Sequence, residues 1–424
     1  MRTKLDIPSV TTYGKKISYV CTDSRETAEG DLFFTTRGND IYISEAQKKG
    51  AYIADCSLTE FAKQYKAKLK NLVYTVGITG SVGKTTTKEF LKILLSEKYR
   101  THATQGNYNN DIGLPLTILE SPADTELLIL EMGMNHTGEI SELSKCAMPD
   151  IGIITNVGSA HIGNFGTREN IAKAKLELLD GLGDGTLIVP YDEPLLSKAK
   201  RLMTFSCQNE AADIFIKELG DGRVRVHLYG ASIAEASFKV RGKQFLLCLG
   251  AAVSAAVLLK ITPDELKNGI EKISNENTRQ KILSVGDFWV LADYYNCSYE
   301  SLVADFELIA SLAYQKKSAL IGSIYELGEH AERIHRDIGV SFSKFGFDKL
   351  YLIGEFSESV RDGALSCGFS AERIFINPSI EATYLTAEQI IKNHTPGEII
   401  LFKASRAVRL ERILELLKAD IGGR

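Results

Sequence analysis

A glycine-rich segment near residue 80 has the residue types of a phosphate-binding loop. It reads Gly77-Ile-Thr-Gly-Ser-Val-Gly-Lys-Thr-Thr86 and lies between an apolar run and a predicted helix. Glycines there let backbone N–H groups close around phosphate oxygens, and the start of a helix adds a favourable potential. We expect Lys84 to reach the β- and γ-phosphates and the Thr85 hydroxyl to hold Mg²⁺. The segment predicts a site for a nucleoside triphosphate, most simply ATP.

The glycine spacing of this loop differs from the standard Walker A pattern. That pattern requires a glycine at position 78, where this chain has Ile78, and Gly77 lies one place earlier. A plain strand–turn–helix, with glycines for geometry alone, is the alternative interpretation. Gly-Lys-Thr directly before a helix favours phosphate binding. The predicted nucleotide-binding residues of the loop are Thr79, Gly80, Ser81, Val82, Gly83, Lys84, Thr85 and Thr86.

A carboxylate and an imidazole follow two further apolar runs. Glu131 comes directly after residues 127–130, and His161 comes shortly after residues 151–155. The carboxyl ends of parallel strands form the ligand crevice of a doubly wound sheet, so we expect both side chains beside the phosphate loop. Alone, Glu131 could cap a turn and His161 could be a hydrogen-bonded structural histidine. Their shared position favours ligation of a divalent cation, which offsets charge in phosphoryl transfer.

The elements that must position these residues alternate short apolar runs with helical stretches. The first such series predicts strands at 72–78, 127–130 and 151–155, with a helix from Lys84 to about Tyr99. Between 187 and 249, closely spaced β-rich pieces predict an antiparallel appendage, at 187–190, 214–216, 224–228 and 237–240.

A second alternating series begins near residue 275 and predicts another parallel α/β sheet. Its predicted strands are 288–292, 318–321, 349–353, 374–376 and 398–402. The region before residue 70 has a short apolar run at 31–35 and a helix-like stretch at 45–51.

Length and composition restrict the class of protein. A chain of 424 residues exceeds one hydrophobic core, which stops growing near ~250–300 residues. Length alone predicts two or three domains, and the changes of pattern along the chain favour three, at residues 1–70, 71–275 and 276–424. A net charge of −4 with interspersed signs gives no basic patch for nucleic acid.

Targeting signals and cysteine usage favour a cytoplasmic protein. No apolar run approaches a membrane span, and the N-terminus lacks the apolar core of a signal peptide. The seven cysteines are scattered without a CxxC pair, which predicts reduced thiols.

Five central motifs, in order, identify a resemblance to the Mur ligases, most closely the MurF type. MurF proteins are the UDP-N-acetylmuramoyl-tripeptide:D-alanyl-D-alanine ligases of peptidoglycan synthesis. The motifs are the phosphate loop continued to Glu89, Thr104 to Thr117, Glu131-Met-Gly-Met-Asn-His136, Asn156-Val-Gly-Ser-Ala-His161, and the run from Asn164 through Ala172-Lys-Ala-Lys175. Flanking motifs extend the resemblance over essentially the whole chain.

The resemblance implies a fold and a reaction. The fold is α/β with three domains: a small N-terminal α/β domain, a central P-loop-type doubly wound parallel sheet, and a C-terminal Rossmann-like α/β domain. The reaction activates a substrate carboxylate as an acyl phosphate with ATP, and an amine then attacks to form an amide. The expected partners are a UDP-linked peptide and a dipeptide amine. The protein itself is expected to be a monomer.

The resemblance also assigns roles to individual residues. Thr85 and Glu131 would bind one Mg²⁺, and Glu131 and His161 a second. Lys175 matches a lysine that the family commonly carbamylates, which makes it an anionic ligand; a surface lysine on a helix is the alternative. Together with Lys84, the residues Glu131, His161 and Lys175 form the predicted catalytic set.

Further positions match the family's binding residues. Arg279, Asp293 and Asn296 match positions around the nucleotide. The predicted substrate residues are Ser24 and Arg25 for the UDP group, Asn107 and Asn110 in the second motif, and Lys403, Ser405 and Arg406 towards the peptide or amine.

Several positions depart from the MurF pattern and leave the substrates open. The departures are Val82 in the phosphate loop, Gln244 and Cys248 where His and Asn are expected, Cys297, Ser298 and Tyr299 after Asn296, Ser323, Ala404, Ala407, and a missing Asp-Gly-His after Gly38. The phosphate and metal residues are intact. The alternatives are therefore a Mur-fold ligase for another carboxylate–amine pair, or a nucleotide-binding, non-catalytic scaffold.

Overall fold

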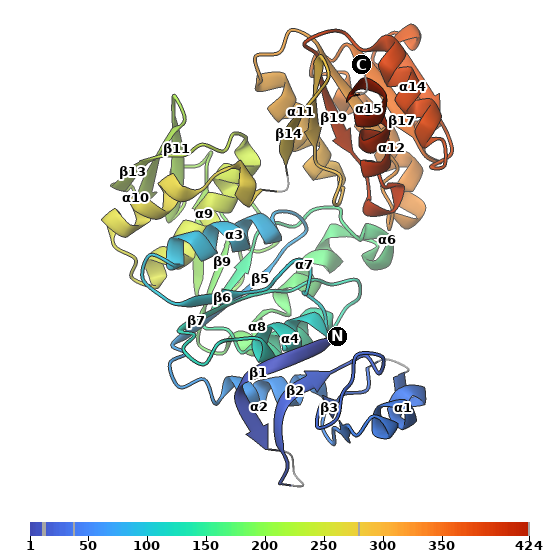
Figure 1. The fold of residues 1–424 in the computed structure, drawn as a ribbon. Helices are drawn as coiled ribbons and strands as arrows, with labels where there is room; N and C mark the ends of the chain where they lie inside the picture. The colour runs from blue at the N-terminus through green and yellow to red at the C-terminus, as the bar shows by residue number, and fades with distance from the viewer. Residues whose placement is uncertain (11–13, 37–38, 279, 423–424) are drawn as a thin grey trace.

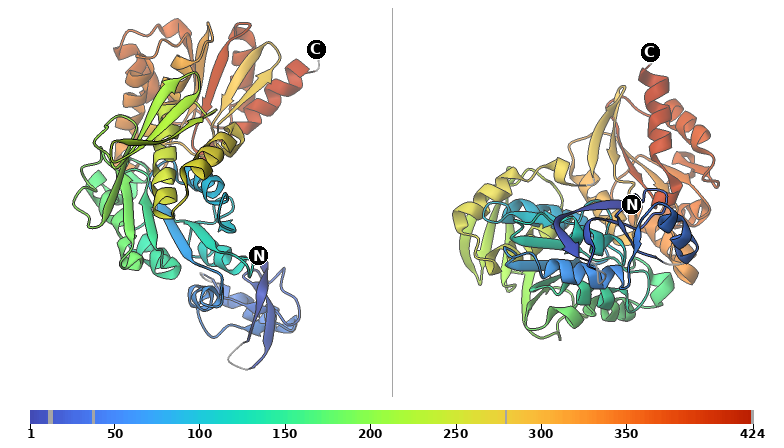
Figure 2. Two further views of the ribbon diagram at one scale, coloured as in Figure 1. Left: turned by 90° about the vertical axis from the view of Figure 1, so that its left-hand side faces the viewer. Right: turned by 60° about the horizontal axis from the view of Figure 1, so that its bottom comes forward.

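The computed structural model describes residues 1–10, 14–36, 39–278 and 280–422, and it contains three separate sheets (Figure 1). The sheets fall within residues 1–70, 71–275 and 276–424, so the parts are called N-terminal, central and C-terminal below. The central part lies between the other two, and the N-terminal part projects from one end of the molecule (Figure 2). In the part of the chain described, no helix is long and apolar enough to cross a membrane.

The N-terminal part is a four-stranded sheet with two helices. Strands β1 and β2 are antiparallel, whereas the β2–β3 and β3–β4 pairs are parallel. Tyr65 in α2 is fully buried, and its hydroxyl donates to Ser121 O at 3.1 Å, which ties this part to the central one. The helix predicted at 45–51 starts two residues earlier and ends at Lys48. The elements are β1 (Arg2–Val10), β2 (Lys16–Cys21), β3 (Leu32–Phe33), α1 (Ile43–Lys48), β4 (Tyr52–Ile53) and α2 (Leu58–Lys66).

The central sheet has nine strands in the order β13-β12-β11-β10-β9-β8-β5-β7-β6. From β6 across to β11 all neighbours are parallel, and β5 lies between β7 and β8. The carboxyl ends of these three strands therefore meet at one edge. The strands are β5 (Tyr74–Thr79), β6 (Thr101–Ala103), β7 (Leu127–Glu131), β8 (Ile151–Ile154), β9 (Thr186–Pro190), β10 (Leu202–Ser206), β11 (Ile214–Gly220), β12 (Arg223–Leu228) and β13 (Ala231–Ser237).

The predicted antiparallel appendage is wrong for its first half. Strands β9, β10 and β11 extend the central sheet in parallel, and only β12 and β13 add antiparallel hairpins at its edge. The piece predicted as a strand at 237–240 is the end of β13 and the chain after it. Strand direction depends on the pairing partner, which for β9 is β8, more than 30 residues earlier in the chain. A short apolar run does not contain that information.

Helices cover both faces of the central sheet. Helix α3 starts at Lys84, as predicted, and ends at Leu95, four residues short of the prediction. It packs against the buried α9, where the Phe90 and Phe245 rings are 6.4 Å apart. The helices are α3 (Lys84–Leu95), α4 (Gly113–Leu119), α5 (Glu139–Ala147), α6 (Ile162–Phe165), α7 (Arg168–Leu176), α8 (Leu179–Leu182), α9 (Lys243–Leu258) and α10 (Pro263–Lys272).

The C-terminal sheet has six strands in the order β14-β15-β19-β16-β17-β18, and only β14 runs antiparallel to its neighbour. The predicted parallel α/β sheet is confirmed; the edge strand β14 was not predicted. The elements are β14 (Lys281–Val285), β15 (Phe288–Ala292), α11 (Tyr299–Ser311), β16 (Lys317–Gly322), α12 (Ala331–Phe342), β17 (Lys349–Ile353), α13 (Ser357–Ser366), β18 (Ile374–Asn377), α14 (Thr383–Asn393), β19 (Ile399–Lys403) and α15 (Glu411–Gly422).

Candidate active site

The loop between β5 and α3 has a conformation that requires glycine at two positions. Gly80 has φ +149°, and a Cβ there would lie 1.8 Å from Thr155 Oγ1. Gly83 caps α3 in the left-handed region, with φ +84°. Side chains at these positions would clash or strain the backbone. The glycines therefore let the loop turn tightly onto the amino end of a twelve-residue helix, a place that favours phosphate.

Residues at the end of β8 brace this loop from below. The Asn156 Oδ1 atom accepts from Ser81 N at 3.1 Å and Val82 N at 2.9 Å, and its Nδ2 donates to Val82 O at 3.0 Å. The Thr155 hydroxyl donates to the same Val82 carbonyl at 2.6 Å. The Lys84 ammonium donates to Gly80 O at 2.7 Å, across the loop. The loop is thus preformed by contacts within the protein.

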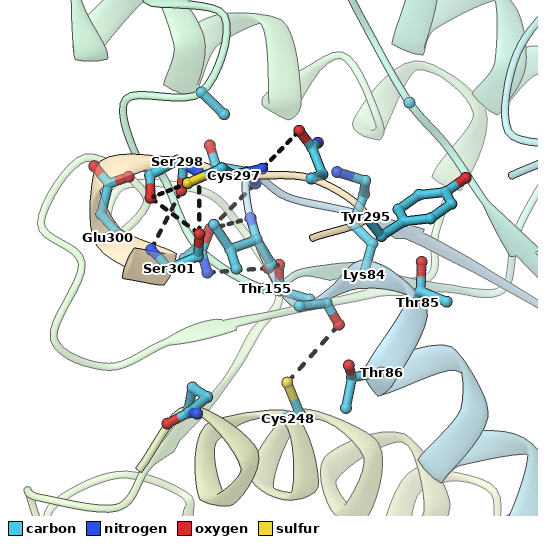
Figure 3. A pocket seen from close by; sticks show the side chains of 18 of the residues that line it. Lys84, Thr85, Thr86, Thr155, Cys248, Tyr295, Cys297, Ser298, Glu300 and Ser301 are labelled. Carbon is cyan, nitrogen blue, oxygen red and sulfur yellow. Dashed lines mark hydrogen bonds between the residues drawn. The ribbon is translucent and has the colours of Figure 1, made fainter. Parts of the chain in front are cut away.

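A cavity of about 730 Å³ opens above the loop, between the central and C-terminal parts. Its walls come from the loop, the end of β8, the start of α9 and the start of α11 (Figure 3), and the end of β7 lines it as well. The predicted site residues that line it are Ser81, Val82, Gly83, Lys84, Thr85, Thr86, Asn107, Asn110, Glu131, His161, Asp293, Asn296 and Lys403.

Other predicted residues lie elsewhere. Thr79 ends β5 and Gly80 is in the loop itself, but neither lines the cavity, and Arg279 lies outside the described residues. In the N-terminal part, Ser24 donates to Glu45 Oε2 at 2.8 Å, and Arg25 pairs with Asp23 at 2.6 Å.

Ser405 and Arg406 also lie away from the large cavity. The Ser405 hydroxyl accepts from Tyr325 N at 3.1 Å. Arg406 pairs with Glu411 at 3.0 Å and lines a separate cavity of about 210 Å³ with Lys281 and Tyr294. Both side chains thus contact residues of the C-terminal part itself and lie away from the phosphate loop.

Glu131 is a buried carboxylate next to the phosphate loop. It is 1% exposed, and its two oxygens accept from Thr85 Oγ1 and Asn109 Nδ2, each at 2.9 Å. A buried anion requires a positive charge nearby, so Glu131 and the Thr85 hydroxyl fit a divalent cation.

The protein supplies few ligands to that cation. In the described ranges, no three His, Cys, Asp or Glu side chains form a metal-binding group. Magnesium commonly keeps several waters and takes one or two carboxylates together with substrate phosphates. A Thr–Glu pair at the mouth of a phosphate loop fits that coordination.

His161 and Lys175 complete a cluster around the loop. Burial lowers the pKa of His161; Glu326 acts in the opposite direction, and Lys84 and Lys175 lower it further. Lys175, in α7, is fully buried, and burial together with the charge of Lys84 holds its pKa well below the ordinary value. Its amine therefore favours the neutral form, which is the form that reacts with carbon dioxide. The surface-lysine alternative for Lys175 is wrong.

The C-terminal wall of the cavity contains a buried charge cluster. Lys403 Nζ lies 2.5 Å from Asp293 Oδ2 and 2.8 Å from Asp305 Oδ2, and Gln280 donates to Asp305 Oδ1. Burial opposes the charge of Lys403, but the two carboxylates outweigh it and raise its pKa. Burial raises the pKa of Asp305 to about 7. The Lys403 ammonium and the Asp293 carboxylate therefore form an ion pair in this conformation.

Asn109 and Glu300 also line the cavity and were not among the predicted site residues. Asn109 contacts Glu131 and stands between two predicted residues of the same motif, so its sequence context gave a signal. Glu300, at the start of α11, accepts from Ser159 N at 2.7 Å and Ser159 Oγ at 3.1 Å. No local pattern marks Glu300, because its partner lies 141 residues away.

The positions that depart from the MurF pattern have structural contacts here. Cys248 lies under the loop, with its sulfur 3.8 Å from Gly83 O (Figure 3). Ser298 caps α11 through its hydroxyl, which accepts from Ser301 N at 3.3 Å. The side chains at these positions make contacts within the protein, but their polar groups differ from those of the MurF pattern.

His335 braces the segment that faces the central part. The imidazole is fully buried and stacks on Phe356; its Nε2 accepts from Ile324 N at 2.9 Å, and its Nδ1 lies 2.7 Å from Ala331 O. Burial lowers its pKa to about 4, with the Ala331 carbonyl acting against that shift. The folded protein therefore keeps the His335 imidazole neutral at pH values above about 4.

We expect this histidine to make the protein less stable in acid. As pH falls below about 6.5, the unfolded chain gains a proton at His335 that the folded chain takes up only near pH 4. The free energy of unfolding should fall by up to about 3 kcal/mol across that window. Urea unfolding at pH 7 and pH 4.5 measures this, and His335→Gln should reduce the dependence. His136→Gln, at an exposed histidine, should leave it unchanged; equal slopes in all three proteins would contradict the prediction.

Comparisons with known proteins agree with this geometry. Residues 78–256 match the Mur ligase middle domain. The chain is 32% identical to the UDP-N-acetylmuramoyl-tripeptide–D-alanyl-D-alanine ligase of Bacillus subtilis, over 93% of this chain and 92% of that protein. The corresponding ligase of Synechocystis is 31% identical over 96% of this chain and 93% of its own length.

Solved structures of similar proteins share the fold. A crystal structure of MurF from Acinetobacter baumannii superposes with a TM-score of 0.84 at 25% identity, covering 98% of this chain and 95% of that one. MurF ligase from Thermotoga maritima in complex with ADP gives 0.81 at 28% identity, covering 96% and 98%. Because it has these relatives and this phosphate loop, the chain belongs to the MurF type of the Mur ligase family. Members of this family are ATP-dependent, ADP-forming ligases.

Proposed function

We propose that this ligase joins the terminal carboxylate of UDP-N-acetylmuramoyl-tripeptide to the amine of D-alanyl-D-alanine. The observation that carries the proposal is the buried Glu131 bound to Thr85 of the phosphate loop, inside a cavity that two parts of the chain enclose. A phosphoryl-transfer site needs this combination of phosphate binding and a cation position. The relatives with this fold carry the name of that activity.

The residues of the loop would bind and orient ATP. Lys84 and the amino end of α3 would hold the phosphates while the substrate carboxylate attacks the γ-phosphorus, releasing ADP and forming an acyl phosphate. The dipeptide amine would then attack the acyl carbon, phosphate would leave, and the amine would lose a proton. Mg²⁺ held at Thr85 and Glu131, and at Glu131, His161 and a carbamylated Lys175, would offset charge on the transferring group.

The substrates would be distributed over the three parts of the chain. We assign the UDP group to Ser24 and Arg25, and the bound peptide to Asn107 and Asn110. The nucleotide would contact Asp293 and Asn296, and the incoming amine would approach Lys403, Ser405 and Arg406. The domain limits 1–70, 71–275 and 276–424, a monomeric state and a cytoplasmic location belong to the same proposal.

A second candidate is a ligase of this fold for another carboxylate–amine pair. Lys403 favours it, because this lysine is held by Asp293 and by Asp305 instead of being exposed to an acceptor. The replaced polar groups at Gln244 and Cys248 favour it as well. Both candidates share the phosphoryl chemistry and differ in the substrates.

An ADP-release assay decides between them. With ATP, Mg²⁺, UDP-N-acetylmuramoyl-tripeptide and D-alanyl-D-alanine, we expect ADP and phosphate to form only when both substrates are present, and the pentapeptide product to appear by mass spectrometry. Turnover with another carboxylate–amine pair, and none with this one, would establish the second candidate. ATP binding without ligation of any pair would make the chain a non-catalytic scaffold.

A further inference from the structure

Two residues from different parts of the chain meet in unusual backbone conformations. His161 has φ +64° and Glu326 has φ +65°, both in the left-handed region. That region is unfavourable for a non-glycine residue and persists where surrounding contacts impose it. The His161 Nδ1 atom contacts the Glu326 carboxylate, so the two strained residues face each other across the boundary between the central and C-terminal parts.

Three hydrogen bonds hold the segment that presents Glu326. Ile324 N donates to His335 Nε2 at 2.9 Å, and Tyr325 N donates to Ser405 Oγ at 3.1 Å. The carbonyl of Glu326 itself accepts from Gly163 N of the central part, at 3.1 Å. The backbone around Glu326 is therefore fixed on both sides of the boundary.

The boundary is closely packed at this point. A Cβ on Gly163 would lie 2.5 Å from Gly328 N and 2.8 Å from Glu326 O. Next to it, His330 Nε2 lies 3.2 Å from Gly166 O. Two glycines thus bring α6 and the segment at Glu326 within backbone contact, which sets the position of the carboxylate relative to His161.

This arrangement determines which imidazole nitrogen can bind a ligand. With Nδ1 against Glu326, Nε2 is the nitrogen that remains for the cavity that His161 lines. A carboxylate on the second nitrogen fixes both the tautomer and the ring orientation of a metal-binding histidine. The Glu326 side chain is 54% exposed, so the ion pair itself adds little stability. Its effect is on the orientation of the ring.

We propose that Glu326 is a positioning residue that orients His161 for the metal ion, so that cation binding and docking of the C-terminal part favour each other. The inference rests on the proposed function through the assignment of His161 as a metal ligand. By linkage, any contact made only in the docked state raises cation affinity by the factor by which the cation stabilises docking. The C-terminal part would thereby complete a site whose direct ligands all belong to the central part.

Binding of Mn²⁺ in the presence of ADP, followed by electron paramagnetic resonance on the full chain, tests the proposal. Glu326→Ala should weaken Mn²⁺ binding about tenfold, the usual effect of losing such a partner, and Glu326→Gln should weaken it less. Glu329→Gln changes a nearby exposed carboxylate and should bind Mn²⁺ as the wild type does. ¹⁵N spectra of labelled histidine should show His161 protonated on Nδ1 in the wild type and on Nε2 in Glu326→Ala.

His161→Ala separates the two levels of the argument. If His161→Ala loses Mn²⁺ affinity while both Glu326 variants keep it and the His161 tautomer stays unchanged, the positioning role is refuted and the proposed function stands. If His161→Ala binds Mn²⁺ like the wild type, its assignment as a metal ligand in the proposed function fails. Glu326→Gln keeps the shape of the side chain and tests the idea even if the alanine variant does not fold.

Discussion

Replacement of Lys84 by alanine should lower kcat/KM for ATP-dependent ligation by about 10²–10³-fold, the usual effect of losing one preorganised group that stabilises transition-state charge. The ammonium lies across the phosphate loop, 2.7 Å from Gly80 O, and lines the cavity. Because the phosphoryl group gains charge on its oxygens during transfer, the loss should appear mainly in kcat. Steady-state ADP release at saturating substrates measures it.

A second lysine of the same helix provides the control. Lys92 is exposed on α3, two turns beyond Lys84, and Lys92→Ala should keep wild-type turnover. Both variants should unfold at the wild-type urea concentration, which would show that α3 is intact. Full activity of Lys84→Ala would contradict the assignment of the loop as the phosphate site and, with it, the proposed chemistry.

Replacement of Lys175 by alanine should abolish turnover, and a short-chain carboxylate such as formate should restore part of it. Lys175 is 2% exposed, and burial together with the charge of Lys84 lowers its pKa, which favours the neutral amine that carbon dioxide can convert to a carbamate. Formate can fill the space left by the side chain and replace the missing carboxylate oxygens. In the wild type, removal of carbon dioxide should lower activity, and bicarbonate should restore it.

Lys173 gives a matched control on α7. It lies two residues before Lys175 and is exposed, so Lys173→Ala should remain active and should not respond to formate. Wild-type activity of Lys175→Ala without any added carboxylate would remove this lysine from the catalytic set. Inactivity without rescue, accompanied by a lower unfolding midpoint, would indicate that Lys175 supports the fold instead.

The features that the sequence predicts well are local ones. The phosphate loop needs left-handed glycines and a helix start within ten residues, and all of these are visible in the order of residues 77–86. The sequence predicts Glu131 and His161 at the same edge because each follows a short apolar run, and parallel strands end together. The parallel sheet after residue 275 is predicted from an equally local signal, because short apolar runs alternate with helical stretches there.

The features that could not be predicted depend on distant partners. Asp305 joins the cluster at Lys403 across 98 residues, and nothing in the helical pattern of α11 marks a buried acid. Ser405 lies beside the predicted Lys403, yet its hydroxyl accepts from Tyr325 N and braces the segment next to Glu326. Neighbouring residues of one motif can thus face different surroundings, because β19 ends between them.

The thiols in the cavity affect how domain movement can be observed. Burial raises the pKa of Cys248 to about 11 and that of Cys297 to about 12, so very little thiolate is present at neutral pH. Cys367, on the C-terminal part, is exposed, Cys56 and Cys207 are half-buried, and the other four cysteines are buried. A maleimide dye should therefore attach at Cys367 first and leave the nucleotide cavity unlabelled. The natural sequence thus provides a preferred attachment point at Cys367 for fluorescence measurements of how the C-terminal part moves when ligands bind.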